Sequence, residues 1–145
     1  MIVLDTNVLS ELMRPTPDAC VVDWLDSQDA SEVTITAITV AEILYGIERL
    51  PSGKRQRRFA AMAAAMFEED FAGRILPFDE VAAVHYAESV AISERAGRVV
   101  HTADTQIAAI CRQHHAMLAT RNVKDFEALG IDILNPWEHR SAPRS

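Results

Sequence analysis

Short apolar runs recur along the chain and indicate β-strands. They fall at Ile2–Asp5, Val33–Thr36, Arg74–Pro77, Met117–Thr120 and Ile131–Leu134. Each run is brief and mainly apolar, as is typical of strands that are covered on both faces. The pattern therefore predicts a central, mostly parallel, five-stranded sheet that is buried on both sides.

The longer stretches between these runs have the periodicity of helices. Two sets of residues follow the i, i+3, i+4, i+7 spacing, namely Val40, Ile43, Leu44 and Ile47, and then Ile107, Ile110, Cys111 and His114. The Ala-rich stretch Phe59–Phe67 has high helix propensity. A further helix is predicted to begin after Asp79 and reach about Ala96, with Gly97 placed to end it.

Strands and helices alternate over the whole length, which predicts a single α/β domain with helices flanking the sheet. A chain of 145 residues suits one compact domain with a substantial core. We place this domain at residues 1–137. Residues 138–145 are mostly polar, include Pro143, and are expected to form a loose C-terminal tail.

Composition narrows the class of protein. Hydrophobic residues make up 49% of the chain, yet no apolar run approaches the roughly 20 residues of a membrane helix, so no membrane association is expected. The first residues carry no basic segment ahead of the apolar run and do not resemble a signal peptide. The only cysteines, Cys20 and Cys111, are too few for a disulfide framework. We expect a cytoplasmic protein.

Charge bears on the partners. The net charge is −7, from 14 basic and 21 acidic residues, which argues against a protein that mainly coats nucleic acid. It does not exclude an enzyme that meets nucleic acid locally and uses metal ions to offset charge. One basic cluster exists, at Lys54, Arg55, Arg57 and Arg58. Such a run is typical of a solvated helix face.

Three carboxylates stand apart from other charges. Asp5 is the only charged residue among the first ten, and Glu42 is the only one from residue 33 to residue 47. Asp104 is the only formal charge from residue 99 to residue 111. Most acidic residues lie in polar company and face water, so this isolation indicates a specific role.

The predicted elements bring these acids toward one place. Asp5 ends the first strand, Glu42 lies in the first turn of the helix after the second strand, and Asp104 opens a late helix. Sites in open α/β sheets form beyond the carboxyl ends of the strands. Two like charges about 4 Å apart repel by on the order of 4 kcal/mol at a surface-like dielectric, so converging carboxylates need a proton or a cation. A hard ion such as Mg²⁺ suits oxygen ligands.

Each acid also has a purely structural interpretation. Asp5 has the position of an N-cap for a helix at Thr6–Met13. Thr39 to Glu42 spells a capping box, in which Glu42 would only bond the backbone of Thr39. Asp104 would complement the dipole of its helix. Taken singly, each acid leaves both interpretations open.

At these residues the chain resembles a PIN domain, and specifically a VapC-type toxin of the FitB-like subgroup. The resemblance rests on six ordered blocks between Met1 and about Trp137: Ile2–Asn7, Thr36–Ile43, Arg74–Asp79, Asp104–Ala109, Ala119–Phe126 and Asn135–Trp137. The first, second, fourth and fifth of these blocks resemble, in turn, a strand ending in Asp-Thr-Asn, S/T-x-x-x-x-x-E, D-x-x-I-A-A and T-x-N-x-x-D-F.

The resemblance implies a Mg²⁺- or Mn²⁺-dependent ribonuclease that cleaves RNA as the toxin of a type II pair. Such proteins are usually homodimers silenced by a small antitoxin, and they meet DNA only through that antitoxin. Asp5, Glu42 and Asp104 match the family's acidic positions. Asp5 and Asp104 would hold the metal directly or through its water, and Glu42 would complete the site or orient the attacking water. On this account Asp5→Ala abolishes cleavage and leaves the fold nearly intact.

The fourth acidic position of the family is where this chain departs. Asn122 stands where some members carry an acid, and Asp125 lies where others carry theirs. Asn122 could coordinate through its carbonyl, and a solvated charge on a surface helix is the alternative for Asp125. Thr6 and Thr120 could position phosphate or water, or only satisfy local backbone. His101, near Asp104, fits a structural histidine.

Three other classes of protein share some of these features. A PIN-fold binding module, catalytically weak and acting through a DNA-binding antitoxin, is supported by the net charge and by Asn122. A receiver-like phosphorylation domain expects a Lys closing a late strand, where this chain has Arg121. A haloacid-dehalogenase phosphatase expects an Asp where this chain has Asn7.

Overall fold

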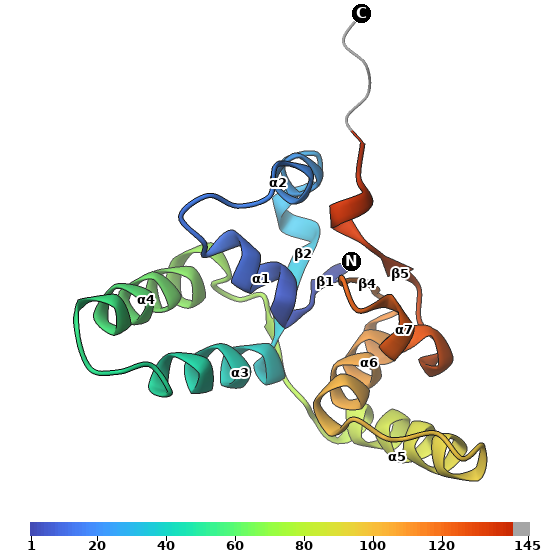
Figure 1. Cartoon of the computed structure of the whole chain (residues 1–145). Coiled ribbons are helices and arrows are strands. Elements are labelled where there is room, and N and C mark those ends of the chain that lie inside the picture. The colour runs from blue at the N-terminus through green and yellow to red at the C-terminus, as the bar shows by residue number, and fades with distance from the viewer. Residues whose placement is uncertain (141–145) are drawn as a thin grey trace, which may run out of the picture.

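The computed structural model describes residues 1–140 and has a five-stranded sheet at its centre (Figure 1). Its strands are β1 (Ile2–Leu4), β2 (Val33–Thr36), β3 (Ile75–Leu76), β4 (Met117–Ala119) and β5 (Ile133–Leu134). All four strand pairs are parallel, in the order β3-β2-β1-β4-β5. The predicted α/β class and parallel sheet are confirmed, although four of the five strands are shorter than predicted.

Helices connect the strands and surround the sheet. They are α1 (Thr6–Leu12), α2 (Ala19–Asp26), α3 (Ala37–Glu48), α4 (Lys54–Ala65), α5 (Glu80–Arg95), α6 (Thr102–His114) and α7 (Val123–Phe126). Short helical turns lie at Ala30–Glu32, Met66–Asp70, Glu127–Leu129 and Pro136–Glu138. Helix α2 was not predicted from the sequence, and it buries the side chains of Val21 and Trp24.

The central strand β1 separates two apolar cores. Ile2 and Leu4 belong to a larger core with helices α1 to α4, whereas Val3 packs with α6, β4 and Phe126 of α7. Successive side chains of a strand point to opposite faces, so a strand between two helical layers must be apolar at every position. Figure 1 shows α3 and α4 on one side of the sheet and α5 and α6 on the other.

The ends of helix α5 follow the sequence prediction. The Asp79 carboxylate accepts a hydrogen bond from the backbone N–H of Ala82 at 3.1 Å and caps the helix. Beyond Arg95, the backbone of Gly97 adopts φ +71°, a left-handed conformation that glycine adopts without steric cost. The predicted start and stop signals are confirmed.

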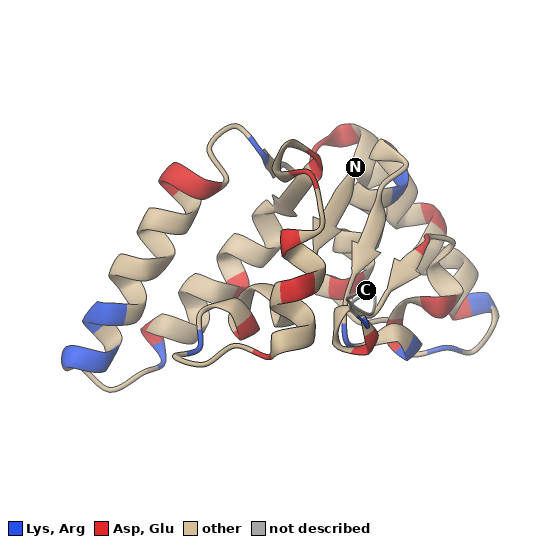
Figure 2. Ribbon diagram, turned by 90° about the horizontal axis from the view of Figure 1, so that it is seen from above, with Lys and Arg blue, Asp and Glu red and all other residues tan. Residues whose placement is uncertain are grey.

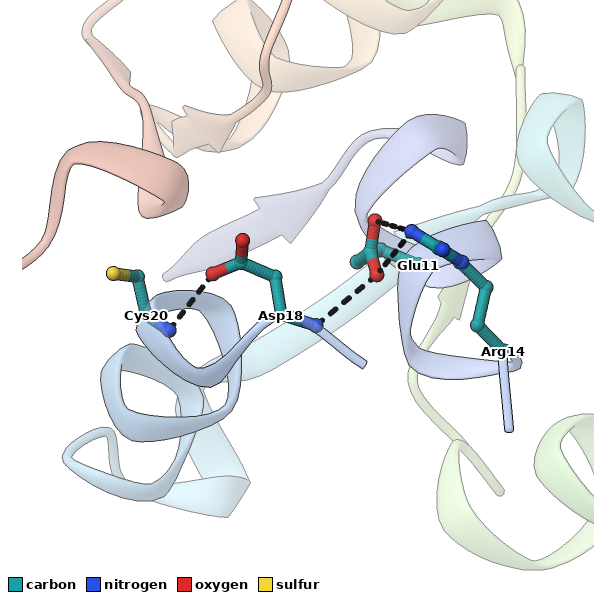
Figure 3. A network of polar contacts seen from close by, with 4 residues as sticks. All are labelled: Glu11, Arg14, Asp18 and Cys20. Atoms are coloured by element: carbon teal, nitrogen blue, oxygen red, sulfur yellow. Dashed lines mark hydrogen bonds and ion pairs between the residues drawn. The ribbon is translucent and has the colours of Figure 1, made fainter. Parts of the chain in front are cut away.

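A buried glutamate fixes the loop between α1 and α2 (Figure 3). Glu11 is 6% exposed and lies 3.1 Å from the Arg14 guanidinium in an ion pair. The same carboxylate accepts the backbone N–H of Asp18 at 3.1 Å, and Asp18 in turn caps α2 through the N–H of Cys20. Since a buried charge must be paired, this acid is accounted for by structure alone.

Two further sequence expectations concern the chain as a whole. Within residues 1–140 no helix combines the length and apolarity that crossing a bilayer requires. Cys20 and Cys111 are both free, as expected. Of the tail predicted at residues 138–145, residues 141–145 lie outside the described part of the chain, so the loose tail stays a prediction.

Candidate active site

Asp5 lies immediately beyond β1, at the edge of the sheet where all the strands end. Its backbone N–H donates to the Ala119 carbonyl at 2.9 Å, which continues the pairing with β4. The residue is 3% exposed, and both carboxylate oxygens are occupied. Oδ1 accepts the N–H of Thr6 at 2.8 Å, whereas Oδ2 accepts the Thr120 hydroxyl at 2.8 Å and the Asn7 amide at 3.3 Å. Asp5 therefore caps α1, as one interpretation predicted, and also faces the site edge.

Asn7 and Thr120 tie this corner to the loop after β4. The Asn7 amide nitrogen donates to the Thr120 hydroxyl oxygen at 3.2 Å, and its carbonyl oxygen accepts the N–H of Arg121 at 3.2 Å. The N–H of Asn122 donates to the same hydroxyl oxygen at 3.0 Å. Thr120 is fully buried, so its one hydroxyl proton is committed to Asp5.

The capping box predicted for Glu42 is wrong. Helix α3 begins at Ala37, because Thr36 has the extended backbone of an N-cap and its hydroxyl accepts the N–H of Thr39 at 3.1 Å. Glu42 consequently lies in the second turn of α3 rather than the first. It makes no bond to the backbone of Thr39, and its side chain is exposed.

Three side chains from α1 and α3 form a chain of hydrogen bonds that ends on Glu42. The Thr6 hydroxyl donates to Glu42 Oε1 at 2.7 Å and lies 3.0 Å from the Thr39 hydroxyl. A hydroxyl has one proton, and Thr6 gives its proton to the carboxylate. Thr39, which is fully buried, must therefore donate to Thr6. This arrangement fixes one oxygen of Glu42 and leaves the other free.

Asp104 reaches the same edge from the first turn of α6. The pKa of its carboxyl is raised from the ordinary 3.8 to about 6. Burial is the largest cause, followed by the negative charges of Asp5, Asp125 and Glu42, while His101 lowers it. No hydrogen bond from any residue between 1 and 140 reaches the Asp104 carboxylate. Burial and three nearby negative charges therefore disfavour the ionised form of Asp104.

The electrostatics favour Asp125 over Asn122 as the fourth acidic residue. The negative charge of Asp125, on α7, raises the pKa of Asp5 and of Asp104. Asn122 precedes α7 and contributes its backbone N–H to Thr120, whereas its amide group forms no capping bond. The pKa of Asp5 is raised mainly by burial, with Glu42 and Asp125 adding to the effect and the bonds from Thr120 and Thr6 opposing it.

These side chains offer the hard oxygen ligands that Mg²⁺ and Mn²⁺ prefer. Across residues 1–140, however, no three His, Cys, Asp or Glu side chains are grouped closely enough to hold one metal ion together. The carboxylates raise the pKa of Asp104, but they do not surround a single point. Fewer than three of them would contact an ion in this arrangement, with water completing the shell, as is usual for Mg²⁺. The residues thus fit a hydrated divalent ion.

Two grooves flank the acids. One, of about 200 Å³, is lined by His101, Asp104, Asp125, Lys124 and Arg98. The other, of about 240 Å³, runs from Thr6 and Glu42 along α3 to Arg55 and Phe59 of α4. Each groove is lined by at least one site acid and at least one basic side chain.

A larger groove lies elsewhere. It has a volume of about 640 Å³ and is lined mainly by apolar residues of α1, α2 and α4, among them Leu12, Leu25 and Met62. None of the site acids lines it. The volume of a groove therefore does not locate the site acids in this chain.

The chain was also compared with known proteins. The PIN domain family matches residues 2–131. This chain belongs to the PIN domain family. It is 45% identical to VapC ribonuclease Y4jK of Sinorhizobium fredii over 95% of this chain and 99% of that one. It is 42% identical to toxin FitB of Neisseria gonorrhoeae, over 94% of this chain and 99% of FitB. The predicted resemblance to VapC and FitB proteins is confirmed.

Solved structures agree. The chain matches FitAB bound to an IR36 DNA fragment with a TM-score of 0.89 and 41% identity, over 97% of this chain and 99% of that one. It matches FitAcB from Neisseria gonorrhoeae with a TM-score of 0.84 and 40% identity, over 95% and 99% of the two chains. The single PIN fold is thereby shown.

The acidic site residues were predicted from the sequence, but the hydrogen bonds that hold them in place were not. Thr39 contacts Thr6 and Asn7 donates to Asp5, yet the sequence does not distinguish a threonine or an asparagine that makes such a contact from one that does not. His101 was assigned a structural role, and it does influence the pKa of Asp104. The N-cap position of Thr36 would have indicated Thr39, because residue N3 of a helix faces its cap.

Proposed function

We propose that this PIN-domain protein is a Mg²⁺- or Mn²⁺-dependent ribonuclease and the toxin of a toxin–antitoxin pair. The supporting observation is that one carboxyl, that of Asp104, experiences the negative charges of three others from separate segments. The relatives named VapC ribonuclease and toxin FitB support the same activity. The nuclease domain is proposed to span residues 1–137.

Asp5 and Asp104 are proposed to hold the ion, directly or through water, with Asp125 lending further negative charge. A bound divalent cation would supply the positive charge that offsets both the carboxylates and the scissile phosphate. Asp5 is held in place by Thr6, Asn7 and Thr120, so its position is fixed before any ligand arrives. Asn122 is the weaker candidate, since it adds no charge.

Glu42 is proposed to act on the attacking water. Its Oε1 is bound by the Thr6 hydroxyl, which leaves Oε2 to accept a proton from water beside the scissile phosphate. Thr39 orients Thr6 and so holds the carboxylate in one direction. Water attacking in line with the departing oxygen cleaves the phosphodiester bond, and that oxygen leaves with a proton from solvent.

Partners follow from the relatives. FitAB and FitAcB are solved assemblies of related proteins, one of them bound to DNA. We propose that this chain pairs with a small antitoxin, forms a homodimer, and meets DNA only through the antitoxin. Cytoplasmic action is proposed because RNA is found there and because the two free thiols, Cys20 and Cys111, suit a reducing compartment.

The test is cleavage of a mixed RNA pool by the purified chain, with Mn²⁺ or with EDTA. We expect cleavage only with the ion, and none by Asp104→Asn at equal concentration. Equal cleavage in EDTA, or by the variant, would contradict the proposal. If the wild-type chain cleaves nothing while still binding its antitoxin, the alternative of a catalytically weak binding module is the correct one.

A further inference from the structure

A groove beside α3 is lined by one site acid, Glu42, and by Arg55 of the basic cluster noted in the sequence. Its other lining residues come from α1, α3 and α4 and include Thr6, Gly46 and Phe59. Lys54, Arg55, Arg57 and Arg58 occupy four of the first five positions of α4. Figure 2 shows these basic residues gathered at the start of that helix, with the acidic residues of the neighbouring segment at its far end.

None of the four cations forms an ion pair with a residue between 1 and 140. Arg55 and Arg58 lie over the Phe59 ring, at 5.6 and 5.9 Å from its centre. A solvated helix face usually mixes both signs at i, i+4 spacing. This segment carries one sign alone.

The cluster also lies where it weakens the fold. Positive charge is unfavourable in the first turn of a helix, because the helix dipole is positive there. The N-cap is Gly53, which supplies no side-chain bond to offset that cost. Like charges at i, i+3 and i, i+4 repel as well. Folding therefore does not account for the positive charge of this turn, and an anionic ligand in the adjoining groove would account for Arg55.

A glycine keeps the groove open. Gly46 lies inside α3, where glycine lowers helix stability relative to alanine. A Cβ built at this position would meet no atom within 4 Å, so packing does not require the glycine. A larger side chain at residue 46 would instead project into the open space of the groove.

We propose that this groove binds single-stranded RNA beside the scissile phosphate, with Arg55 contacting a backbone phosphate and Phe59 offering its ring to a base. The inference rests on the proposed ribonuclease function and assigns the path of its substrate. Guanidinium groups bind phosphate through several donors, and aromatic rings bind bases without regard to sequence. The continuity with Glu42 favours the substrate over a protein ligand, since the strand must pass the acids to be cut.

The test measures the affinity of the full chain for a fluorescein-labelled single-stranded RNA of mixed sequence, by anisotropy in EDTA. Arg55→Ala is expected to raise Kd about tenfold and to lower the slope of log Kd against log salt by about 0.7, the value for one phosphate contact on a single strand. Arg55→Lys keeps the charge and should keep the slope.

Matched controls separate this contact from general charge and from misfolding. Arg57→Ala removes the same charge from the same helix but does not line the groove, so its Kd should change by about twofold or less. Gly46→Leu fills the groove without changing charge and should raise Kd about tenfold while thermal stability holds or rises. Gly46→Ala should bind as the wild type does.

Unchanged affinity and slope in Arg55→Ala would overturn the proposal, and the groove would then belong to a protein partner. Equal loss in Arg57→Ala and Arg55→Ala would overturn it too, because only diffuse charge would matter. The ribonuclease proposal can fail separately. A wild-type chain without metal-dependent cleavage contradicts that function, whereas cleavage with an unchanged KM in Arg55→Ala contradicts only the assigned path.

Discussion

The corner after β1 and the start of α6 each present one aspartate to the same edge of the sheet. The two aspartates differ in their burial and in the hydrogen bonds that they accept. Asp5 is buried and accepts hydrogen bonds from Thr6, Asn7 and Thr120. Asp104 is half-buried, accepts no such bond from residues 1–140, and has its pKa raised to about 6. The hydrogen bonds of Asp5 therefore stabilise the fold, whereas the ionised carboxylate of Asp104 destabilises it in the absence of a cation.

The contrast shows how a cluster of like charges can be built. One member is fixed by hydrogen bonds, which favour its ionised form, and another is left to be neutralised by a proton or a cation. Strained electrostatics of this kind mark functional sites more often than structural ones. The comparison predicts that the two residues respond alike in activity and differently in stability.

The largest expected effect is on cleavage. Asp5→Asn and Asp104→Asn each remove one negative charge from the field that attracts the cation, so each should lower kcat by at least about 10²-fold. Single-turnover cleavage of RNA with Mn²⁺ measures this. A variant at either position that retains activity within a few-fold of the wild type would remove that aspartate from the mechanism.

The next effect separates the two aspartates by stability. Asp5→Ala leaves three donors without an acceptor, whereas Asp5→Asn keeps one acceptor oxygen. Asp5→Ala should therefore unfold with a free energy about 2 kcal/mol lower than Asp5→Asn. This revises the expectation that Asp5→Ala leaves the fold nearly intact. The matched pair Asp104→Ala and Asp104→Asn should differ by less than about 0.7 kcal/mol, the span of ordinary helix propensities. Urea unfolding in EDTA compares all four.

A smaller effect is expected at Thr39. Thr39→Val removes the hydroxyl that orients Thr6 and should lower kcat about tenfold, in the range of other supporting residues around metal sites. Thr39→Ser retains the hydroxyl and should recover most of the rate. The check is kcat at saturating RNA for the two variants. Loss in Thr39→Ser equal to that in Thr39→Val would show that packing, rather than orientation, is at stake.

The smallest effect depends on pH. In the metal-free chain the Asp104 carboxyl keeps its proton up to about pH 6 when folded, but loses it near pH 4 when unfolded. The free energy of unfolding of the wild type therefore falls as pH rises through this interval, whereas that of Asp104→Asn does not change through this group. The variant should gain on the order of 1 kcal/mol above pH 6, after allowance for solvent screening, and nothing below pH 4. Thermal unfolding at a series of pH values measures the difference, and a gain that is independent of pH would contradict the assignment.

The sequence predicted the fold well because its signals are local. Continuous apolar strands and alternating helices indicate an α/β sheet, and Asp79 and Gly97 mark the ends of α5. Asp5, Glu42 and Asp104 could be selected because each lies alone among uncharged residues. Parallel strands then imply that they share an edge, as the mutual influence on pKa values supports.

The remaining features depend on contacts between distant segments. Thr39 acts on Glu42 through Thr6, which lies 33 residues away, and no periodicity encodes that relay. The start of α3 was misplaced because Thr36 and Thr39 are both good caps, and only pairing of β2 decides between them. Whether Asp125 or Asn122 faces the acids depends on how the short helix α7 is oriented.

The central claim is that these carboxylates share a cation, and calorimetric titration of the chain with Mn²⁺ at pH 6 tests it most directly. Asp104 is about half protonated there, so binding should release about half a proton, measured from the heats in two buffers of different ionisation enthalpy. Asp104→Asn should bind more weakly and release fewer protons. Absence of binding by the wild type, or the same proton release from the variant, would contradict the account.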